Sequence, residues 1–382
     1  MSSVPSLPPA RYITTNEALC TLVDQLSEET LLALDTESNS MHAYRGQVCL
    51  IQLSTRKQDY IIDPLAITDM QPFGRLLQSP TIEKIFHAAE YDLICMQRDF
   101  GFSVVNVFDT MLASRLLGVP NVGLADVLAA HFGVKPDKKH QLDDWGERPL
   151  AEESLIYAQM DTHYLPGLRD ELRLELQDTS LLEEATEIFQ DLQFIEVEEK
   201  QFDPDGYWKI GRPRALDRRE MMFLREFYLV REAIAEEENV PPYKIMTNKA
   251  MIRLAQKPPT NFKDLFDLRE ISPKVVRAYG EDFLNAAERA EQSKPPRPPR
   301  IPRKDPIMIE RYTALHAWRK SVAEKRGIDS SLVVPKSLLW QIAEQMPTSR
   351  DSLGQITGMG PWRLERYGDD ILAITHRLNG KH

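Results

Sequence analysis

The sequence predicts an α/β domain, with a mixed sheet flanked by helices, followed by two all-helical domains. Three observations support this fold class: short apolar segments rich in β-branched residues lie near the start, helical patterns fill the second half, and that half contains an internal repeat. A chain of 382 residues is too long for one compact core, so two or three domains are expected.

Three strands are predicted near the start, at residues 31–35, 48–53 and 59–63. Short turns separate them, which suggests an antiparallel meander. Helices are expected next, at residues 81–100 around one break, 107–117, 124–131 and 152–175. This order fits a mixed sheet better than a regular alternation of strand and helix.

The second half of the chain repeats itself. Residues 235–255 align without a gap on residues 323–343, at an offset of 88. The same offset places Arg231 on Arg319 and Tyr279 on Tyr367. Chance similarity does not keep register over about 140 residues, so we predict two copies of one helical domain, each with its own core.

These patterns predict the domain boundaries. The α/β domain covers residues 1–200, the first helical domain 213–293 and the second 305–382. Residues 294–304 contain five prolines and five basic residues and are expected to form an extended linker. Binding of this linker to an aromatic groove or to phosphates is an open alternative.

Composition and charge narrow the class of protein. The 42% hydrophobic and 27% charged content is ordinary for a globular chain. The three cysteines form no C-x-x-C pair, so we expect neither a disulfide framework nor a zinc cage, and a reducing, cytoplasmic location. No apolar run approaches the roughly 20 residues of a membrane span, and residues 1–10 lack the pattern of a secretory signal, so no membrane partner is expected.

The two halves differ in charge. Residues 1–200 carry 15 basic and 33 acidic side chains, whereas residues 201–382 carry 32 and 25. An acidic half suits metal binding, and a basic half attracts polyanions. The acidic stretch Glu183–Glu199 is expected to be only a solvated helix face.

Three acidic clusters occur in order within the first 165 residues: Asp35 with Glu37, Asp92, and Tyr157 with Asp161. Asp35 and Glu37 would share one face of a strand, and Tyr157 and Asp161 one face of a helix. Each cluster alone has a structural explanation. Together, four carboxylates and a tyrosine are what a two-metal phosphodiesterase needs, because hard divalent cations prefer oxygen ligands.

In combination these motifs resemble the DEDD superfamily of 3′–5′ exonucleases, in the subclass with tyrosine in the third motif, and within it the ribonuclease D family. Further stretches support the resemblance: Arg45-Gly46 with Cys49–Ser54, Asp63-Pro64-Leu65, and Asp144-Trp145 with Arg148-Pro149-Leu150. The repeated helical domains resemble HRDC domains. The resemblance covers nearly the whole chain.

The resemblance implies a ribonuclease H-like exonuclease domain followed by two HRDC domains. It implies metal ligands at Asp35, Glu37, Asp92 and Asp161, with Tyr157 positioning the attacking water and no organic cofactor. The implied reaction releases 5′-mononucleotides from the 3′ end of RNA with two Mg²⁺ or Mn²⁺ ions roughly 4 Å apart. The implied substrates are tRNA precursors and other small structured RNAs, and we expect a monomer.

Several neighbouring residues receive lesser roles. Ser38–Tyr44 is expected to touch the terminal nucleotide, while His87, Glu90 and His163 are expected to support the metal ligands or to be structural rather than catalytic. Asp143 is acidic where the resemblance implies a small polar residue, which weakens the expectation of a substrate contact there.

The second helical domain combines basic and aromatic residues that suit single-stranded RNA, among them Trp318, Lys336, Trp340 and Arg363. Gly358 and Gly360 could expose backbone N–H groups to a phosphate at a helix start. The alternative is that the tryptophans are core residues and the lysines are solvated. Which helical copy contacts RNA is open at this point.

Two rival functions remain. One is a free 3′–5′ DNA exonuclease, which digestion of matched RNA and DNA would separate. The other is a non-catalytic RNA-binding protein with a decayed nuclease domain. The complete set of carboxylates and Tyr157 argues against decay, which would remove a ligand first.

Overall fold

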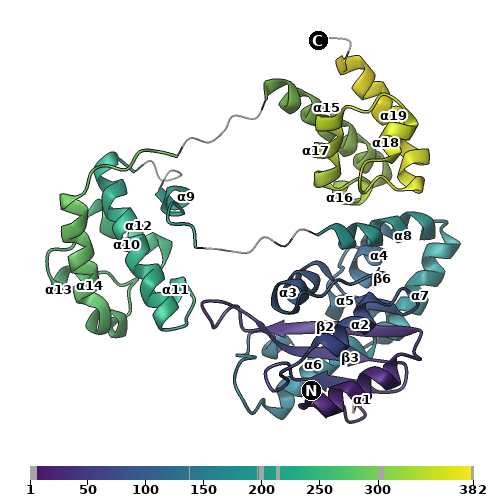
Figure 1. Cartoon of the computed structure of the whole chain (residues 1–382), viewed down its shortest axis with the longest axis horizontal. Coiled ribbons are helices and arrows are strands. Elements are labelled where there is room, and N and C mark those ends of the chain that lie inside the picture. The colour runs from purple at the N-terminus through teal and green to yellow at the C-terminus, as the bar shows by residue number, and fades with distance from the viewer. Residues whose placement is uncertain are drawn as a thin grey trace. The chain divides into compact units, whose positions relative to one another are not determined.

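The computed structural model describes residues 7–136, 138–195, 197, 202–211, 216–299 and 305–379. The chain forms two compact units (Figure 1). The first joins residues 1–37, 48–198 and 303–382, and the second joins residues 38–47 with 199–302. Residues 300–304 of the predicted linker, and the outer ends of both predicted helical domains at 213–215 and 380–382, lie outside the described residues. The predicted domain boundaries therefore stay predictions.

The first unit is built on a mixed sheet of six strands in the order β1-β4-β3-β2-β5-β6. The strands are β1 (Arg11–Ile13), β2 (Leu31–Ser38), β3 (Val48–Ser54), β4 (Asp59–Ile62), β5 (Glu83–Phe86) and β6 (Val107–Asp109). β3 and β4 pair antiparallel, whereas the pairs β1–β4, β2–β5 and β5–β6 are parallel. The mixed sheet is as predicted, and the three predicted strands are β2, β3 and β4.

Two helix predictions were wrong at their starts, and β1 was not predicted. Residues 81–100 contain β5 before α3 (Glu90–Phe100), and residues 107–117 contain β6 before α4 (Thr110–Leu116). Strands of four and three residues are too short to show their own period beside a long amphipathic helix. The predicted helix at 152–175 is two helices, α6 (Glu152–His163) and α7 (Leu165–Asp178), separated at Tyr164.

Helices cover both faces of the sheet. The remaining helical elements of this domain are α1 (Asn16–Leu26), α2 (Gln71–Gln78), α5 (Leu124–Phe132), α8 (Leu182–Gln190) and the 3-10 turns η1 (Lys138–His140) and η2 (Asp191–Phe194). Along β2, Leu32 and Leu34 enter the core beneath α1, α2 and α3. Leu31 and Ala33 enter the opposite core, with α4, α5, α7 and α8. Burial on both faces makes β2 an almost continuous apolar run, which is why the sequence showed it clearly.

The predicted duplication is confirmed helix by helix. The first copy contains α10 (Arg218–Glu237), α11 (Pro242–Ile245), α12 (Asn248–Gln256), α13 (Phe262–Phe266) and α14 (Pro273–Gln292), preceded by α9 (Tyr207–Gly211). The second contains α15 (Pro306–Arg326), α16 (Ser330–Val333), α17 (Lys336–Gln345), α18 (Arg350–Gly354) and α19 (Pro361–Asn379). Each helix of the second copy begins 88 residues after its counterpart. Arg231 and Arg319, also 88 apart, are both buried and donate to corresponding carbonyls, those of Met246 and Val334.

The second helical copy belongs to the first unit and docks on α8 and η2. The guanidinium of Arg363, only 1% exposed, donates to both carboxylate oxygens of Asp191 at 2.8 and 2.7 Å. Arg326 donates to both oxygens of Glu184 at 2.6 Å. Glu184 and Glu187 are 1% and 5% exposed, so the prediction of a solvated acidic face was wrong for this part of 183–199. Their negative charge is matched by arginines that the sequence places about 140–180 residues away.

The start of α19 is occupied by Glu187. Its carboxylate accepts the backbone N–H groups of Trp362 and Arg363 at 2.9 and 3.1 Å, the usual partners of an anion at a helix N-terminus. A Cβ at Gly360 would lie 2.1 Å from Glu187 Oε2, so only glycine permits this approach. The alternative of a phosphate at this helix start was therefore wrong, because a carboxylate of the same chain already fills the place.

The loop Ser38–Gln47, which connects β2 to β3, groups with the second unit. The Tyr44 hydroxyl donates to Glu232 at 3.3 Å, and the Tyr243 hydroxyl donates to the carbonyl of Met41 at 2.9 Å. The expected contact of this loop with a nucleotide stays a prediction. None of the helices in the described part of the chain is both long and apolar enough to cross a bilayer.

Candidate active site

All five predicted site residues line one hollow of about 400 Å³ in the first domain: Asp35, Glu37, Asp92, Tyr157 and Asp161. They come from three elements. Asp35 and Glu37 lie near the end of β2, Asp92 in the first turn of α3, and Tyr157 and Asp161 one turn apart on α6. Segments distant in sequence thus converge on one place, as the motif order predicted.

Three of the carboxylates could hold one cation between them. Ligand oxygens of Asp35, Glu37 and Asp161 all lie within 4.8 Å of one another. A donor set made only of carboxylate oxygens, without sulfur or imidazole, suits hard divalent ions such as Mg²⁺ or Mn²⁺. The site therefore fits the divalent metal that the acidic motifs imply.

Asp92 lies beside this group and is held by Thr36. Its Oδ1 accepts the Thr36 backbone N–H at 3.0 Å and the Thr36 hydroxyl at 2.5 Å. Side chains alternate along β2, so Thr36 points toward the face that α3 covers, whereas Asp35 and Glu37 point to the other. One strand therefore supplies two carboxylates and also fixes a third. This role of Thr36 was not predictable from the sequence, because a threonine between two acids carries no motif of its own.

The turn before α3 is shaped by a second residue that sequence reasoning missed. Asp109, 1% exposed, accepts the backbone N–H groups of Ala88 and Ala89 at 3.3 and 2.8 Å. Ala88 has a φ of 68°, a conformation that alanine rarely adopts, and these bonds help hold it. Asp109 also caps α4, and a capping acid directly before a helical run is the signal that could have found it.

The segment before α6 packs against Tyr157 through the ring of Trp145. Trp145 is buried, and its ring centroid lies 6.2 Å from that of Tyr157. Arg148 donates through Nε and Nη2 to the two oxygens of Asp63 at 2.7 and 2.8 Å. A bidentate salt bridge between Arg148 and Asp63 therefore joins two of the stretches on which the family resemblance rests.

The neighbours with expected lesser roles have structural partners. His163 Nδ1 lies 2.8 Å from Asp59, and His87 Nδ1 lies 2.9 Å from the Thr110 hydroxyl. Asp143 accepts the Ser154 hydroxyl at 2.6 Å and lies 2.8 Å from His140 Nδ1. Asp143 thus ties the preceding loop to α6. Glu90 is exposed at the start of α3.

Burial and mutual repulsion raise the pKa of all four carboxylates in the metal-free cluster. Burial, with the charges of Asp161 and Asp92, raises the pKa of Glu37 to about 9. Burial raises the pKa of Asp161 and of Asp92 to about 7, although Tyr157 and Thr36 respectively oppose the rise by hydrogen bonding. Burial and the surrounding carboxylates raise the pKa of Asp35 well above its usual range. A bound cation would relieve this repulsion, so the electrostatics of the cluster favour binding of a divalent metal ion.

The pKa of Glu37 leads to a test by stability. A group whose pKa is higher in the folded state stabilises the fold below its unfolded pKa, and this contribution is lost as the pH rises through the folded pKa. Metal-free wild type should therefore lose stability between about pH 4.5 and 9. We expect Glu37→Gln to raise the Tm in EDTA by several degrees at pH 8, and by much less at pH 5.

Differential scanning calorimetry at both pH values would check this result. Glu28→Gln, at an exposed turn, is the control and should leave the Tm within about a degree, as a surface change usually does. Mg²⁺ should raise the Tm of wild type more than that of Glu37→Gln. A Glu37→Gln protein less stable than wild type at pH 8 would contradict the raised pKa.

The mixed sheet and its carboxylate-lined hollow define a metal-dependent exonuclease domain. Residues 10–177 match the family model described as 3'-5' exonuclease, and residues 220–286 and 309–375 each match the HRDC domain. The chain belongs to the 3′–5′ exonuclease family with HRDC domains that includes ribonuclease D and RRP6.

Two solved structures support this assignment. The catalytic core of RRP6 from Trypanosoma brucei is 32% identical with a TM-score of 0.68, and the match covers 76% of this chain and 83% of that one. RNase D from Escherichia coli, described as an exoribonuclease involved in structured RNA processing, is 25% identical with a TM-score of 0.66. That match covers 97% of this chain and 99% of the other.

A curated relative is considerably longer. The exosome complex component 10 homolog of Caenorhabditis elegans is 34% identical over 284 residues, which are 72% of this chain and 32% of the relative. The chain thus spans about a third of the length of such relatives.

Proposed function

We propose that this chain is a 3′–5′ exoribonuclease that hydrolyses RNA from its 3′ end and releases 5′-mononucleotides. The observation that carries the proposal is the convergence of Asp35, Glu37, Asp92, Tyr157 and Asp161 on one hollow. The likeness to E. coli RNase D over nearly the whole of both chains supports RNA as the substrate.

Each carboxylate has a place in the proposed reaction. Asp35, Glu37 and Asp161 would bind divalent cations, and Asp92 would join them through the oxygen that Thr36 does not engage. When bound, two Mg²⁺ or Mn²⁺ ions acidify a water and stabilise the charge on the leaving oxygen. The hollow of about 400 Å³ is lined by residues of β2, α3 and α6, and we propose that it receives the 3′ end of the strand while the rest of the RNA stays outside.

Tyr157 is proposed to orient the attacking water. Burial and the charges of Asp161 and Glu37 raise the pKa of Tyr157 above that of a free phenol, so its hydroxyl stays protonated at neutral pH. A phenol in that state is no general base. It hydrogen-bonds to Asp161, and its oxygen remains able to accept a hydrogen bond from a water beside the cluster.

The biological setting is part of the proposal. The resemblance to ribonuclease D favours tRNA precursors and other small structured RNAs as substrates, acted on by a monomer. Cys20, Cys49 and Cys95 form no disulfide in the described structure, which supports a reducing compartment such as the cytoplasm.

Digestion of end-labelled RNA tests the proposal. With Mg²⁺ or Mn²⁺, 3′-labelled RNA should release its label first as a mononucleotide, whereas 5′-labelled RNA should shorten step by step. EDTA should stop both reactions. A matched DNA strand serves as control: equally rapid loss of DNA would favour the DNA exonuclease, and no loss of either strand would favour a non-catalytic RNA-binding protein.

A further inference from the structure

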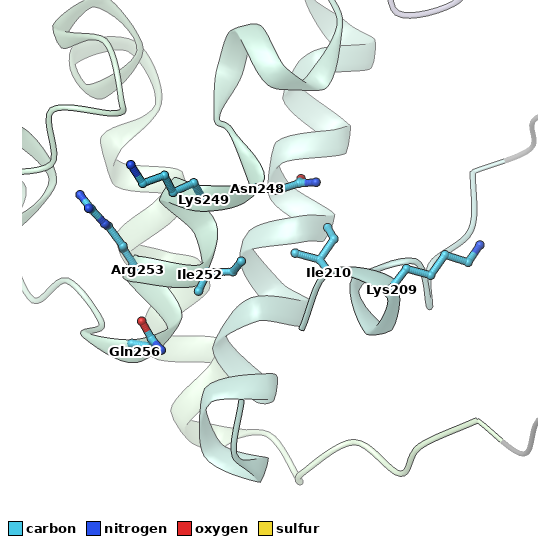
Figure 2. A pocket seen from close by; sticks show the side chains of 7 residues that line it. All are labelled: Lys209, Ile210, Asn248, Lys249, Ile252, Arg253 and Gln256. Carbon is cyan, nitrogen blue, oxygen red and sulfur yellow. The ribbon is translucent and has the colours of Figure 1, made fainter. Parts of the chain in front are cut away.

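The first helical domain contains a basic hollow of about 700 Å³ between α9 and α12. Lys249 and Arg253 extend from α12 and Lys209 from α9, while Ile210 and Ile252 face each other between them (Figure 2). Within the part of the chain that the structure describes, the residues lining the hollow include no carboxylate. Three cations around an apolar floor suit a polyanion that also presents flat apolar groups.

Each of the three cations has a carboxylate partner and an exposed side chain of its own. Lys209 lies 3.1 Å from Asp203, and their side chains are 82% and 48% exposed. Lys249 and Arg253 are 70% and 50% exposed and share one partner, Glu270, which is 20% exposed. Two exposed cations share this single carboxylate, and ion pairs at the surface contribute about 0–1 kcal/mol, so a phosphate can compete with it.

The duplicated domain provides an internal comparison. At the offset of 88, Lys249 corresponds to Ser337 and Arg253 to Gln341. Ile252 corresponds to Trp340, whose ring stacks on Tyr312 at 3.9 Å between centroids. The second copy carries one cation on this face, Lys336 at the position of Asn248, whereas the first copy carries Lys249 and Arg253 on its α12.

The second copy uses its arginines differently. Arg326 and Arg363 are taken up by Glu184 and Asp191 in the docking contact, and Trp318 and Trp362 pack against Tyr367. Much of its basic and aromatic pattern thus has a structural explanation. The comparison favours the first copy as the place where RNA is held.

We propose that the hollow between α9 and α12 binds consecutive phosphates of single-stranded RNA through Lys249, Arg253 and Lys209. Ile210 and Ile252 contact the sugars and base edges between those phosphates. The inference rests on the proposed exoribonuclease function, for which this hollow would hold a part of the substrate away from the 3′ end. Short oligonucleotides that fill only the active site would not need it.

The test replaces the two α12 cations by the residues of the second copy. Lys249→Ser with Arg253→Gln in the full chain should weaken binding of a fluorescent 20-nucleotide RNA about tenfold in 0.15 M salt, measured by anisotropy in EDTA. The slope of log Kd against log salt should fall by about 1.4, or 0.7 for each lost phosphate contact. Hydrolysis of a trinucleotide with Mg²⁺ should not change.

The matched control removes the same charges from another face of the same domain. Lys274→Ser with Arg277→Gln, both exposed on α14, should leave affinity and salt slope unchanged. Glu270→Gln should tighten RNA binding, because it frees Lys249 and Arg253 from their carboxylate. An opposite effect of this kind cannot come from misfolding.

The outcomes separate this inference from the proposed function. Equal binding by wild type and the α12 double variant, or equal losses in both double variants, would overturn the site while leaving the nuclease intact. A protein that binds RNA through this hollow but never shortens it would leave the site standing and remove the enzyme.

Discussion

Asp35→Asn should reduce exonuclease activity at least about a thousandfold, which corresponds to about 4 kcal/mol of lost transition-state stabilisation. The substitution keeps the shape of the side chain but removes a charge that lies within 4.8 Å of the ligand oxygens of Glu37 and Asp161. Because burial and the neighbouring carboxylates raise the pKa of Asp35, loss of its charge should stabilise the metal-free protein and leave the fold intact. Single-turnover hydrolysis of a short RNA would measure the effect without product release.

Asp126→Asn is the matched control for this prediction. Asp126 lies on α5, whose neighbours Leu124 and Ala125 line the same hollow, but its carboxylate is 45% exposed and lies 3.8 Å from Lys135. The same change of charge there should alter the rate less than about threefold, as expected for a weak surface pair. Activity of Asp35→Asn within tenfold of wild type would exclude the carboxylate cluster from the reaction.

Arg363→Met should lower the free energy of unfolding by about 3–5 kcal/mol, the usual cost of breaking a buried ion pair from one side. Its guanidinium is 1% exposed and donates to Asp191, and also to the carbonyls of Val333 and Gly358. Methionine would leave the buried Glu187 and the partly buried Asp191 without their cation. Burial already raises the pKa of both, so the loss should be larger at pH 8 than at pH 5.

Arg350→Met in the same domain provides the comparison. Arg350 also grips a carboxylate with two hydrogen bonds, those to Asp369 at 3.0 and 2.7 Å, but its side chain is 46% exposed and that of Asp369 is 80%. Its loss should cost no more than about 1 kcal/mol. Thermal unfolding of the two variants would measure the difference. Similar Tm values would mean that the ion pair of Arg363 with Asp191 contributes little to stability.

The grouping of the candidate site residues was predictable from sequence because each pair lies within a short motif. Asp35 and Glu37 follow a run of buried strand residues, and Tyr157 and Asp161 are spaced by one helical turn. The spacing of each pair therefore predicts that both side chains lie on one face of their element. Thr36 and Asp109 could not be foreseen in the same way. Their roles depend on which helix covers which face of the sheet, and that is settled by packing over the whole domain.

The errors have the same origin. β5 and β6 are recognisable only by their pairing with β2 and with each other, which a linear pattern does not contain. Glu184 and Glu187 are polar in composition and helical in spacing, so they were taken for a solvated face. They are buried because a domain from the far end of the chain brings Arg326 and Arg363 to them. Duplication, in contrast, was visible directly, since it is a property of the sequence itself.

The difference between the helical copies at the docking contact also bears on assembly during synthesis. The first copy leaves the ribosome roughly 4–18 s before the second, at 5–20 residues per second, and so meets the completed α8 first. At the positions of Arg326, Gly360 and Arg363 it carries Glu238, Ser272 and Val275. Glu238 would then face Glu184, and the side chain of Ser272 would clash with Glu187 where Gly360 has no Cβ. Docking of the first helical copy on α8 in place of the second is thus opposed by charge repulsion and by steric clash. This keeps the protein out of a long-lived misassembled state.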